Sequence, residues 1–309
     1  MLSVVVPVFD EEESVLAFYA ELLKELSKFA KEYEIIFIDD GSRDKTLEIL
    51  KDLGEKDENV KVFSFRRNHG KSEALTFGFQ KAKGELIVTL DADLQDKPSE
   101  IIKLLDKQKE GFDLVSGWRK ERKDSGAKIL FSKVFNFMAS FFWKVKLHDY
   151  NCGLKLYTAD AAKSLNLYGG MHRFIPLLTA QEGFRVTEVA VVHDTRKFGK
   201  SKYSAWKVLT QMPDMMTMLF LSKFSQRPLH FFGFFGALLV FLGILICFYL
   251  TILHFQGEAI GRRPLLFLGM LLIIAGMQVG FTGLIADMIL SVSKKDQLRT
   301  IILKYSSSK

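Results

Sequence analysis

The 309-residue chain has only two cysteines, Cys152 and Cys247. They lie far apart in the sequence and Cys247 falls inside a long apolar run, so a disulfide framework and a cysteine zinc site are both excluded. The first residues, MLSVVVPVFDEEES, have no basic leader and no apolar core of signal-peptide length ahead of the first acids. We therefore expect no signal peptide and an N-terminus that stays in the cytoplasm.

The composition indicates a mixed protein, partly in water and partly in a membrane. Hydrophobic residues make up 48% of the chain and charged residues 26%. The first value is high for an average soluble protein, and the second is high for a purely membranous one. The apolar surplus is concentrated in residues 228–254 and 265–290. Each run can span a bilayer, which needs about 20 apolar residues, and two spans return the C-terminus to the cytoplasm.

The positive charges support this orientation only in part. Lys223 and Arg227 precede the first run and Lys294 follows the second, but Arg262 and Arg263 lie in the connecting loop. Basic residues favour the cytoplasmic side of a span, so the loop arginines oppose the assignment. The net charge of +7 fits either a surface near anionic lipid headgroups or a solvated lysine-rich face. No nucleic-acid partner is predicted.

Residues 1–203 predict an α/β domain. Apolar runs of strand length alternate with helical patterns. Continuous apolar strands separated by such helices favour a Rossmann-like, largely parallel sheet with helices on both faces. The predicted strands are 2–8, 33–42, 60–65 and 85–93, and the predicted helices are 14–33, 45–54 and 71–83. Ligands bind beyond the carboxyl ends of the strands in such sheets.

Acidic residues follow three of the predicted strands, where a ligand site is expected. These acids are Asp10, Glu11, Asp39, Asp40, Asp91 and Asp93. Local explanations exist for the first four, because Asp40 with Gly41 and Ser42 could form a turn that caps the next helix. Residues 10–13 could likewise favour a helix N-terminus through its dipole.

The stretch LIVTLDADLQDKP, residues 86–98, carries the strongest signal. In extended chain the spacing of Asp91 and Asp93 directs both carboxylates to one side. Two converging carboxylates repel each other unless a cation lies between them, and oxygen ligands suit Mg²⁺ or Mn²⁺. Such an ion at a sheet edge commonly neutralises a diphosphate leaving group. The alternative is a charged turn.

Five segments, VVVPVFDEE, IIFIDDGSRDKT, NHGKSEAL, LDADLQD and DYNCGLK, occur in that order. Together they resemble a family 2 glycosyltransferase of GT-A fold, and specifically its polyprenyl-phosphate branch. The resemblance covers the whole chain, because bacterial members of this branch append a pair of membrane spans. It implies a GT-A domain followed by interfacial helices and a two-helix transmembrane hairpin.

The resemblance also implies a donor site. Nucleotide-sugar binding would fall to Pro7, Phe9, Glu11, Ile38 and Asp40, with Asp40 accepting from a nucleobase N–H and Asp39 as the competing choice. The metal and diphosphate segment would be Asp91, Ala92, Asp93 and Gln95, in which Asp91, Asp93 and Gln95 surround Mg²⁺ or Mn²⁺. Asp96, with Lys97 and Pro98, is left to cap the next helix.

Further matches are cationic or lie near the reacting centre. Arg119, with Arg122 as a second choice, matches a residue that brings positive charge to the donor phosphates. The planar guanidinium group is well shaped for this contact. Lys128, Arg196 and Lys202 match acceptor-phosphate and lid residues, with a plain headgroup contact as the alternative. Asp149 matches an acid near the reacting centre. A lipid phosphate is already anionic, so we expect Asp149 to position a substrate rather than act as a base.

The membrane-proximal organisation follows from the same reading. Residues 128–146 and 204–227 are rich in aromatic or apolar residues with basic residues interspersed, and predict either interfacial helices or ordinary core helices. The predicted divisions are 1–203, 204–227, 228–254, 265–290 and a cytoplasmic tail at 291–309. Glycines spaced four apart, such as Gly276 and Gly280, allow close helix packing, so a homo-oligomer is expected.

The implied activity is transfer of a hexose, with UDP-glucose as the first choice, to a polyprenyl phosphate such as undecaprenyl phosphate. The resemblance implies a metal-dependent, inverting enzyme at the cytoplasmic face of the inner membrane. GDP-mannose, UDP-galactose, N-acetylhexosamine and aminoarabinose donors are alternatives. Processive synthases usually have more spans and a QxxRW motif, which this sequence lacks. A nucleotide-sugar sensor is the non-enzymatic alternative.

Overall fold

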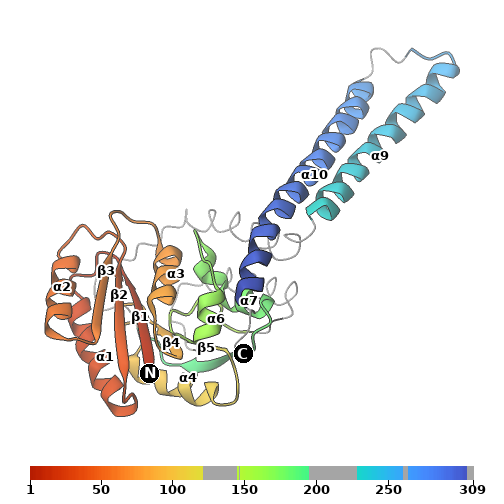
Figure 1. The fold of residues 1–309 in the computed structure, drawn as a ribbon. Helices are drawn as coiled ribbons and strands as arrows, with labels where there is room; N and C mark the ends of the chain where they lie inside the picture. The colour runs from red at the N-terminus through yellow and green to blue at the C-terminus, as the bar shows by residue number, and fades with distance from the viewer. Residues whose placement is uncertain (121–144, 146, 195–227, 260–263, 305–309) are drawn as a thin grey trace. The chain divides into compact units, whose positions relative to one another are not determined.

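The computed structural model describes residues 1–120, 145, 147–194, 228–259 and 264–304, with side chains described up to residue 289. The chain divides into two compact units, Met1–Met218 and Leu219–Lys309 (Figure 1). Each unit is described by itself. The predicted interfacial segments, 128–146 and 204–227, lie almost entirely outside the described residues.

The first unit contains a seven-stranded sheet in the order β3-β2-β1-β4-β6-β5-β7. Strands β1 to β4 are parallel where they pair, β6 runs antiparallel to both β4 and β5, and β7 is parallel to β5. The prediction of a largely parallel sheet is confirmed. The strands are β1 (Leu2–Val8), β2 (Tyr33–Asp39), β3 (Val60–Ser64), β4 (Leu86–Thr89), β5 (Leu114–Arg119), β6 (Lys155–Thr158) and β7 (Val186–Val191).

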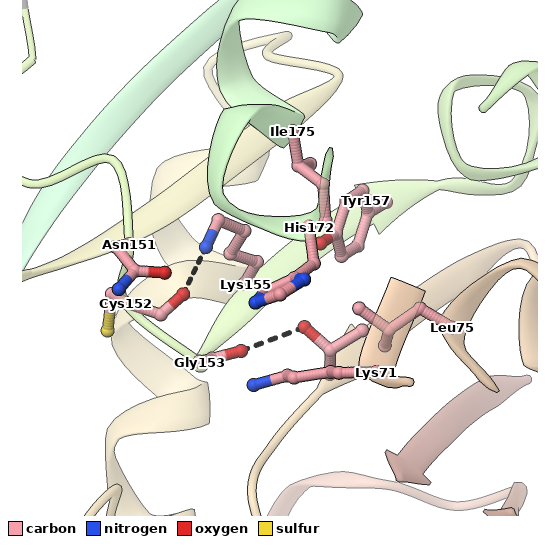
Figure 2. Close-up of a pocket in the computed structure, with 10 residues that line it drawn as sticks. Lys71, Leu75, Asn151, Cys152, Gly153, Lys155, Tyr157, His172 and Ile175 are labelled. Carbon is pink, nitrogen blue, oxygen red and sulfur yellow. Dashed lines mark hydrogen bonds between the residues drawn. The ribbon is translucent and has the colours of Figure 1, made fainter. Parts of the chain in front are cut away.

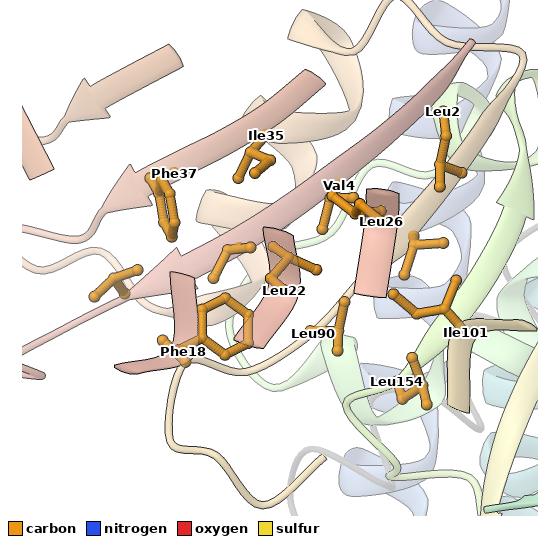
Figure 3. Close-up of a cluster of buried hydrophobic side chains, with 14 of the residues drawn as sticks. Leu2, Val4, Phe18, Leu22, Leu26, Ile35, Phe37, Leu90, Ile101 and Leu154 are labelled. Atoms are coloured by element: carbon orange, nitrogen blue, oxygen red, sulfur yellow. The ribbon is translucent and has the colours of Figure 1, made fainter. Parts of the chain in front are cut away.

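Helices cover both faces of this sheet, as predicted. Its helices are α1 (Val15–Phe29), α2 (Thr46–Lys56), α3 (Lys71–Lys81), α4 (Ile101–Gln108), α6 (Ala159–Ser164) and α7 (Ile175–Gln181), with 3₁₀ turns η1 (Pro98–Glu100) and η2 (Met171–Phe174). Alternate residues of a strand point to opposite faces. Val4 and Val6 of β1 therefore join Phe18 and Leu22 of α1 in the main core (Figure 3), while Val5 faces α3.

Helix α3 lies close against the sheet because it carries a glycine at the contact. A Cβ atom added to Gly78 would lie 2.4 Å from Val5 Cγ1 and 2.9 Å from Ile38 Cδ1. Real Cβ atoms do not approach carbons this closely, so a larger residue would push α3 away from β1 and β2. The N-terminus of α3 holds Lys71, so this contact fixes where the Lys71 side chain begins.

The second unit is a pair of apolar helices, α9 (Pro228–Phe255) and α10 (Pro264–Lys304). Residues Pro228–Phe255 and Pro264–Ile289 are long and apolar enough to cross a membrane. These bounds agree with the predicted runs to within one residue at each end. Helix α10 continues through the segment predicted as a tail, as far as Lys304.

Glycines let the two apolar helices approach closely along their length. A Cβ atom on Gly236 would lie 2.6 Å from the Gly276 carbonyl oxygen, and one on Gly243 would lie 2.6 Å from the Gly269 carbonyl oxygen. Small residues at helix contacts are how membrane helices pack without a hydrophobic driving force. Four of the glycines therefore have a use within the hairpin, and the homo-oligomer stays a prediction.

We predict that Gly78→Ala destabilises the first unit by about 1–3 kcal/mol, the usual cost of overpacking a core. This loss exceeds the gain of up to about 1 kcal/mol that alanine brings to a helix interior. Thermal unfolding of the purified protein in detergent measures the effect. Gly54→Ala is the matched control, because its Cβ atom would lie 3.3 Å from the Val62 Cγ2 methyl and 3.8 Å from the Val60 carbonyl oxygen, with no contact below 3.0 Å. Equal melting temperatures for the two variants would contradict the packing account.

Candidate active site

The acids predicted to form a site lie at one edge of the sheet. Strands β2, β1 and β4 are consecutive neighbours and parallel, so their carboxyl ends meet. Asp39 ends β2, while the segments that begin at Phe9 and at Leu90 follow β1 and β4. The topology therefore brings together three segments that are distant in the sequence, as expected for this class of sheet.

The loop after β1 is tied to the loop after β2. Asp10 adopts a left-handed backbone conformation, with φ of 49°. Its amide donates to Ser42 Oγ at 3.0 Å, and its carboxylate accepts from the amide of Arg43 at 2.8 Å. The amide of Glu11 donates to Thr46 Oγ1 at 2.9 Å. These bonds fix the predicted nucleotide-binding segment, Pro7 to Glu11, against the start of α2.

The two acids at the end of β2 are buried, with Asp39 1% exposed and Asp40 4% exposed. Asp39 accepts from the amide of Ser42 and the hydroxyl of Ser64. Asp40 accepts from the amides of His69 and Gly70, at 2.7 and 2.9 Å. Asp40 therefore braces the loop before α3 and does not cap α2, so the local alternative is wrong for this residue.

Burial raises the pKa of the Asp40 carboxyl, although its two backbone hydrogen bonds act in the opposite direction. A carboxylate oxygen that already accepts one amide proton has a second lone pair. The assignment of Asp40 to a nucleobase N–H is compatible with these bonds and stays a prediction. Ile38, the other residue assigned to the base, is fully buried.

The segment after β4 differs from the extended chain that we predicted. Strand β4 ends at Thr89, and residues 92–95 form a turn in which Leu94 has φ of 59°. The i, i+2 argument for Asp91 and Asp93 is therefore wrong in its geometry. The turn instead lets the Asp93 carboxylate accept from the amide of Gln95 at 3.2 Å. Ala92, the first residue of this turn, is buried.

A lysine meets the acids of this turn. Lys71 Nζ lies 2.5 Å from Asp91 Oδ1. Burial by itself would lower the pKa of the Lys71 ammonium, but Asp91 at contact, with Asp96 and Asp93 nearby, raises it. The same pairing outweighs desolvation and lowers the pKa of Asp91. The electrostatic environment of these three carboxylates therefore favours a cation.

Asp96 does not cap the helix that follows it. Its side chain is 3% exposed, and Oδ1 lies 3.0 Å from His193 Nδ1. The residue before the 3₁₀ turn η1 is Lys97, and no side chain caps that turn. The prediction for Asp96 is wrong because residues 96 and 193 pair as an isolated antiparallel bridge, which directs the carboxylate to the histidine.

The predicted metal ligands have suitable chemistry. Two carboxylates and an amide oxygen, from Asp91, Asp93 and Gln95, lie within five residues of the chain. Hard oxygen donors of this kind suit Mg²⁺ or Mn²⁺. Within the described residues, no three His, Cys, Asp or Glu side chains are gathered around one point. The ion pair between Lys71 Nζ and Asp91 Oδ1 is the observation in favour of a cation here, because a carboxylate that holds an ammonium can also hold a metal ion.

Arg119, the last residue of β5, forms a two-point ion pair with Asp149. The distances are 2.7 Å from Nε to Oδ2 and 3.1 Å from Nη2 to Oδ1, and Nη2 also donates to the Asn151 carbonyl. The side chains are 14% and 2% exposed. Asp149 raises the pKa of Arg119 although burial opposes this. The structure thus joins two residues that the sequence had assigned to separate tasks.

This pairing bears on the role of Asp149. A guanidinium fork stabilises the ionised form of the carboxylate that it holds, which makes that carboxylate a poor proton acceptor. The geometry agrees with positioning rather than general-base catalysis. Asp149 also fixes its own loop, because Oδ1 accepts from the amide of Asn151 at 3.1 Å.

Four residues near the site received no role from the sequence: Lys71, Lys155, His172 and His193. Lys71 and Lys155 stand in quoted segments, NHGKSEAL and DYNCGLK, so the motif pattern could have flagged them. The two histidines carry no local signal, because each reaches the site only through the fold. The assigned residues Arg122, Lys128, Arg196 and Lys202 lie outside the described part of the chain.

Comparison with known proteins places the chain among sugar transferases. Residues 3–165 match the model of glycosyl transferase family 2. Over 301 residues the chain is 36% identical to dodecaprenyl-phosphate galacturonate synthase of Rhizobium johnstonii, covering 96% of this chain and 89% of the relative. It is 33% identical to undecaprenyl-phosphate 4-deoxy-4-formamido-L-arabinose transferase of Photorhabdus laumondii, covering 93% and 88%.

Solved structures share the fold. Glucosyl-3-phosphoglycerate synthase from Mycobacterium tuberculosis, crystallised with Mn²⁺ and UDP-glucose, has a TM-score of 0.53 and 20% identity, covering 72% of this chain and 78% of that one. Another solved structure, described as that of a mycobacterial protein, has a TM-score of 0.55 and 20% identity, covering 72% of this chain and 74% of that one. These values confirm the GT-A fold predicted for the first unit, and they are too low in identity to transfer a ligand.

We predict that Arg119 and Asp149 are strongly coupled in stability. Asp149→Asn or Arg119→Met alone should each cost about 3–5 kcal/mol, because each leaves a buried charge without its partner. The double variant should lose less than the sum of the single losses, by about 0.5–3 kcal/mol. Thermal unfolding of the four proteins measures the cycle.

The exposed pair Lys109 and Asp106 provides the matched control. Their side chains are 73% and 62% exposed and 2.7 Å apart. Exposed pairs couple by at most about 1 kcal/mol. If the two single losses at Arg119 and Asp149 simply add, with a coupling energy no larger than that of the control cycle, the buried pair does not act as a unit.

Proposed function

The chain belongs to glycosyl transferase family 2, and on this basis we propose that it transfers a sugar from a nucleoside-diphosphate donor to a polyprenyl phosphate at a membrane surface. The observation that carries the proposal is the extent of the relationship. The two relatives named for prenyl-phosphate sugars align with 96% and 93% of this chain, a span that includes the apolar hairpin as well as the sheet.

The acidic sheet edge supports a donor site of this kind. We assign the nucleotide to Pro7, Phe9, Glu11, Ile38 and Asp40, and the diphosphate to the turn at Asp91, Ala92, Asp93 and Gln95. A nucleoside diphosphate brings negative charge to an edge that already carries carboxylates, so a divalent cation is required between them. When bound, Mg²⁺ or Mn²⁺ would act as a Lewis acid on the departing diphosphate.

Transfer needs no general base from the chain. An oxygen of the lipid phosphate forms a bond to the anomeric carbon while the bond from that carbon to the diphosphate breaks, and the electron pair leaves with the nucleoside diphosphate. One displacement of this kind inverts the anomeric configuration. Arg119 and Asp149 hold the wall of the site beside the reacting groups, and Lys128, Arg196 and Lys202 would attract the acceptor phosphate.

The apolar hairpin supports a reaction at a membrane surface. Two spanning helices tether the catalytic unit to the surface where a polyprenyl phosphate presents its headgroup. We propose the cytoplasmic face of the inner membrane, since nucleotide sugars are cytoplasmic substrates. A UDP-sugar is our donor class. Glucose was the first expectation, but the two relatives are named for galacturonate and formamidoarabinose.

We predict metal-dependent transfer of radiolabelled sugar from one member of a panel of UDP- and GDP-sugars to undecaprenyl phosphate in detergent. EDTA should abolish the transfer. Asp93→Asn should lower its rate by about 100-fold or more, because the variant lacks one carboxylate that would hold the metal ion, and the ion would stabilise the charge on the departing diphosphate. Asp106→Asn, an exposed acid on α4, is the matched control and should keep full activity.

Metal-dependent nucleotide binding without transfer from any donor would overturn the proposal and favour a nucleotide-sugar sensor. Full transfer in the presence of EDTA would retain the enzyme but remove the metal from its mechanism.

A further inference from the structure

Two places in the molecule hold polar side chains that have no role in the proposed function. The first is a small pocket beside the acidic turn, lined in part by Lys71, Lys155 and His172 (Figure 2). Lys155 is buried there, and its ammonium donates to the Cys152 carbonyl. The pocket has a volume of about 10 Å³, which holds about one water molecule, and the Asp91 carboxylate interacts with both lysines. It therefore belongs to the site already described.

The second place is Gln278 in the apolar helix α10. Gln278 lies 14 residues after the start and 11 residues before the end of the span Pro264–Ile289. At 1.5 Å per residue these separations are about 21 Å and about 17 Å, which puts the residue near the centre of a hydrocarbon layer about 30 Å thick. Long side chains near the ends of a span can reach the interface, but a glutamine at this depth cannot.

The side chain of Gln278 points away from the other helix of the hairpin. Helix α10 contacts α9 at Gly269, Gly276 and Gly283, where an added Cβ atom would lie between 2.6 and 3.0 Å from atoms of α9. Gln278 is two residues beyond Gly276, which is about 200° around a helix of 3.6 residues per turn. It is exposed, and its amide forms no hydrogen bond within the described residues.

An exposed amide at this depth has no water with which to form hydrogen bonds. Lipid tails offer neither donors nor acceptors, so the polar atoms lose the hydrogen bonds that they form in water. The two threonines of the spans avoid this cost. Thr251 and Thr282 donate to the Cys247 and Gln278 carbonyls of their own helices, at 2.8 and 2.9 Å. The Gln278 amide lacks such a bond, and a partner outside the hairpin would satisfy it.

A second copy of the chain provides such a partner at the right depth. It crosses the membrane with the same span, so its own Gln278 lies at the same level. In a two-fold symmetric contact, the residues on the axis meet their own equivalents. The amide of glutamine has both an N–H donor and a carbonyl acceptor, so two of them can donate to each other. A different membrane protein would need a polar group at this one depth.

The rest of this face has the spacing of a helix pair. The neighbours of Gln278 on the face follow at intervals of three and four residues, as in the heptads through which two helices pack. They are 57–63% exposed, and they are Leu271, Ile274, Phe281 and Ile285. A single polar residue in such a seam fixes the register of the pair. Lipid covers apolar side chains equally well, so the amide is the feature that favours a protein partner.

We propose that the face of α10 centred on Gln278 docks against the same face of a second copy, with the two amides hydrogen-bonded to each other near the centre of the bilayer. The inference rests on the membrane location in the proposed function. It gives the expected homo-oligomer a specific contact, which is separate from the glycines that pack α10 against α9 within one chain.

The test measures self-association of the full-length protein by sedimentation equilibrium in two density-matched detergents of different tail length. The unaltered protein should form a dimer. Gln278→Leu keeps the approximate size of the side chain and removes its hydrogen-bonding atoms, so it should raise the dissociation constant of the dimer by about 10-fold or more. Gln278→Asn keeps an amide at this position and should dimerise more tightly than Gln278→Leu.

Thr282→Val is the matched control. It also removes a polar group from this helix, but the hydroxyl of Thr282 already bonds to its own helix. Thr282→Val should therefore dimerise as the unaltered protein does. Equal helix content by circular dichroism in all four proteins would exclude unfolding as the cause of a difference.

Transfer of radiolabelled sugar is measured on the same preparations, which separates this inference from the proposed function. A protein that transfers sugar as a monomer, or as a dimer that Gln278→Leu does not weaken, would overturn the inference and leave the proposed function standing. Pairing that depends on Gln278, without transfer from any donor, would overturn the proposed function and leave the inference standing.

Discussion

The repulsion among carboxylates at one edge of the sheet is the constraint on which the site depends. Asp91, Asp93 and Asp96 lie within six residues, and all three act on the ammonium of Lys71. Such a cluster costs free energy unless positive charge is supplied. The fold supplies part of it from α3, through a lysine 2.5 Å from Asp91. A substrate diphosphate adds further negative charge at this edge, and a divalent ion would then have to compensate it.

The architecture serves this edge by close backbone contacts. Gly78 brings α3 onto β1 and β2, and α3 carries Lys71. Gly153 leaves room for the carboxylates of Asp91 and Asp96, which would lie 2.8 and 2.6 Å from a Cβ atom at that position. Asp40 ties the loop before α3 to the end of β2. The positions of the charges therefore follow from the packing of neighbouring elements, not from the acidic turn alone.

The sequence was sufficient to predict the first four strands, the helices between them and a largely parallel sheet, because apolar strands and intervening helices constrain each other strongly. The strand order and the strands β5 to β7 were not predicted. The sequence also located Asp91 and Asp93, since their spacing is local. It failed on the backbone of the turn, where Leu94 adopts a positive φ that no local pattern predicts. The role of Asp96 was predicted wrongly because its partner, His193, lies 97 residues away. The role of Arg119 was predicted incompletely because its partner, Asp149, lies 30 residues away. Lys155 was overlooked because its burial is a tertiary property.

The most direct test of a cation-requiring edge is the melting temperature of Lys71→Met, measured in EDTA and with added Mn²⁺. Without its ammonium the acidic turn has lost its internal counter-ion, so the variant should melt below the unaltered protein in EDTA. Mn²⁺ should raise its melting temperature by more than that of the unaltered protein or of Lys109→Met. Equal melting temperatures in EDTA, with no selective effect of Mn²⁺, would contradict the account.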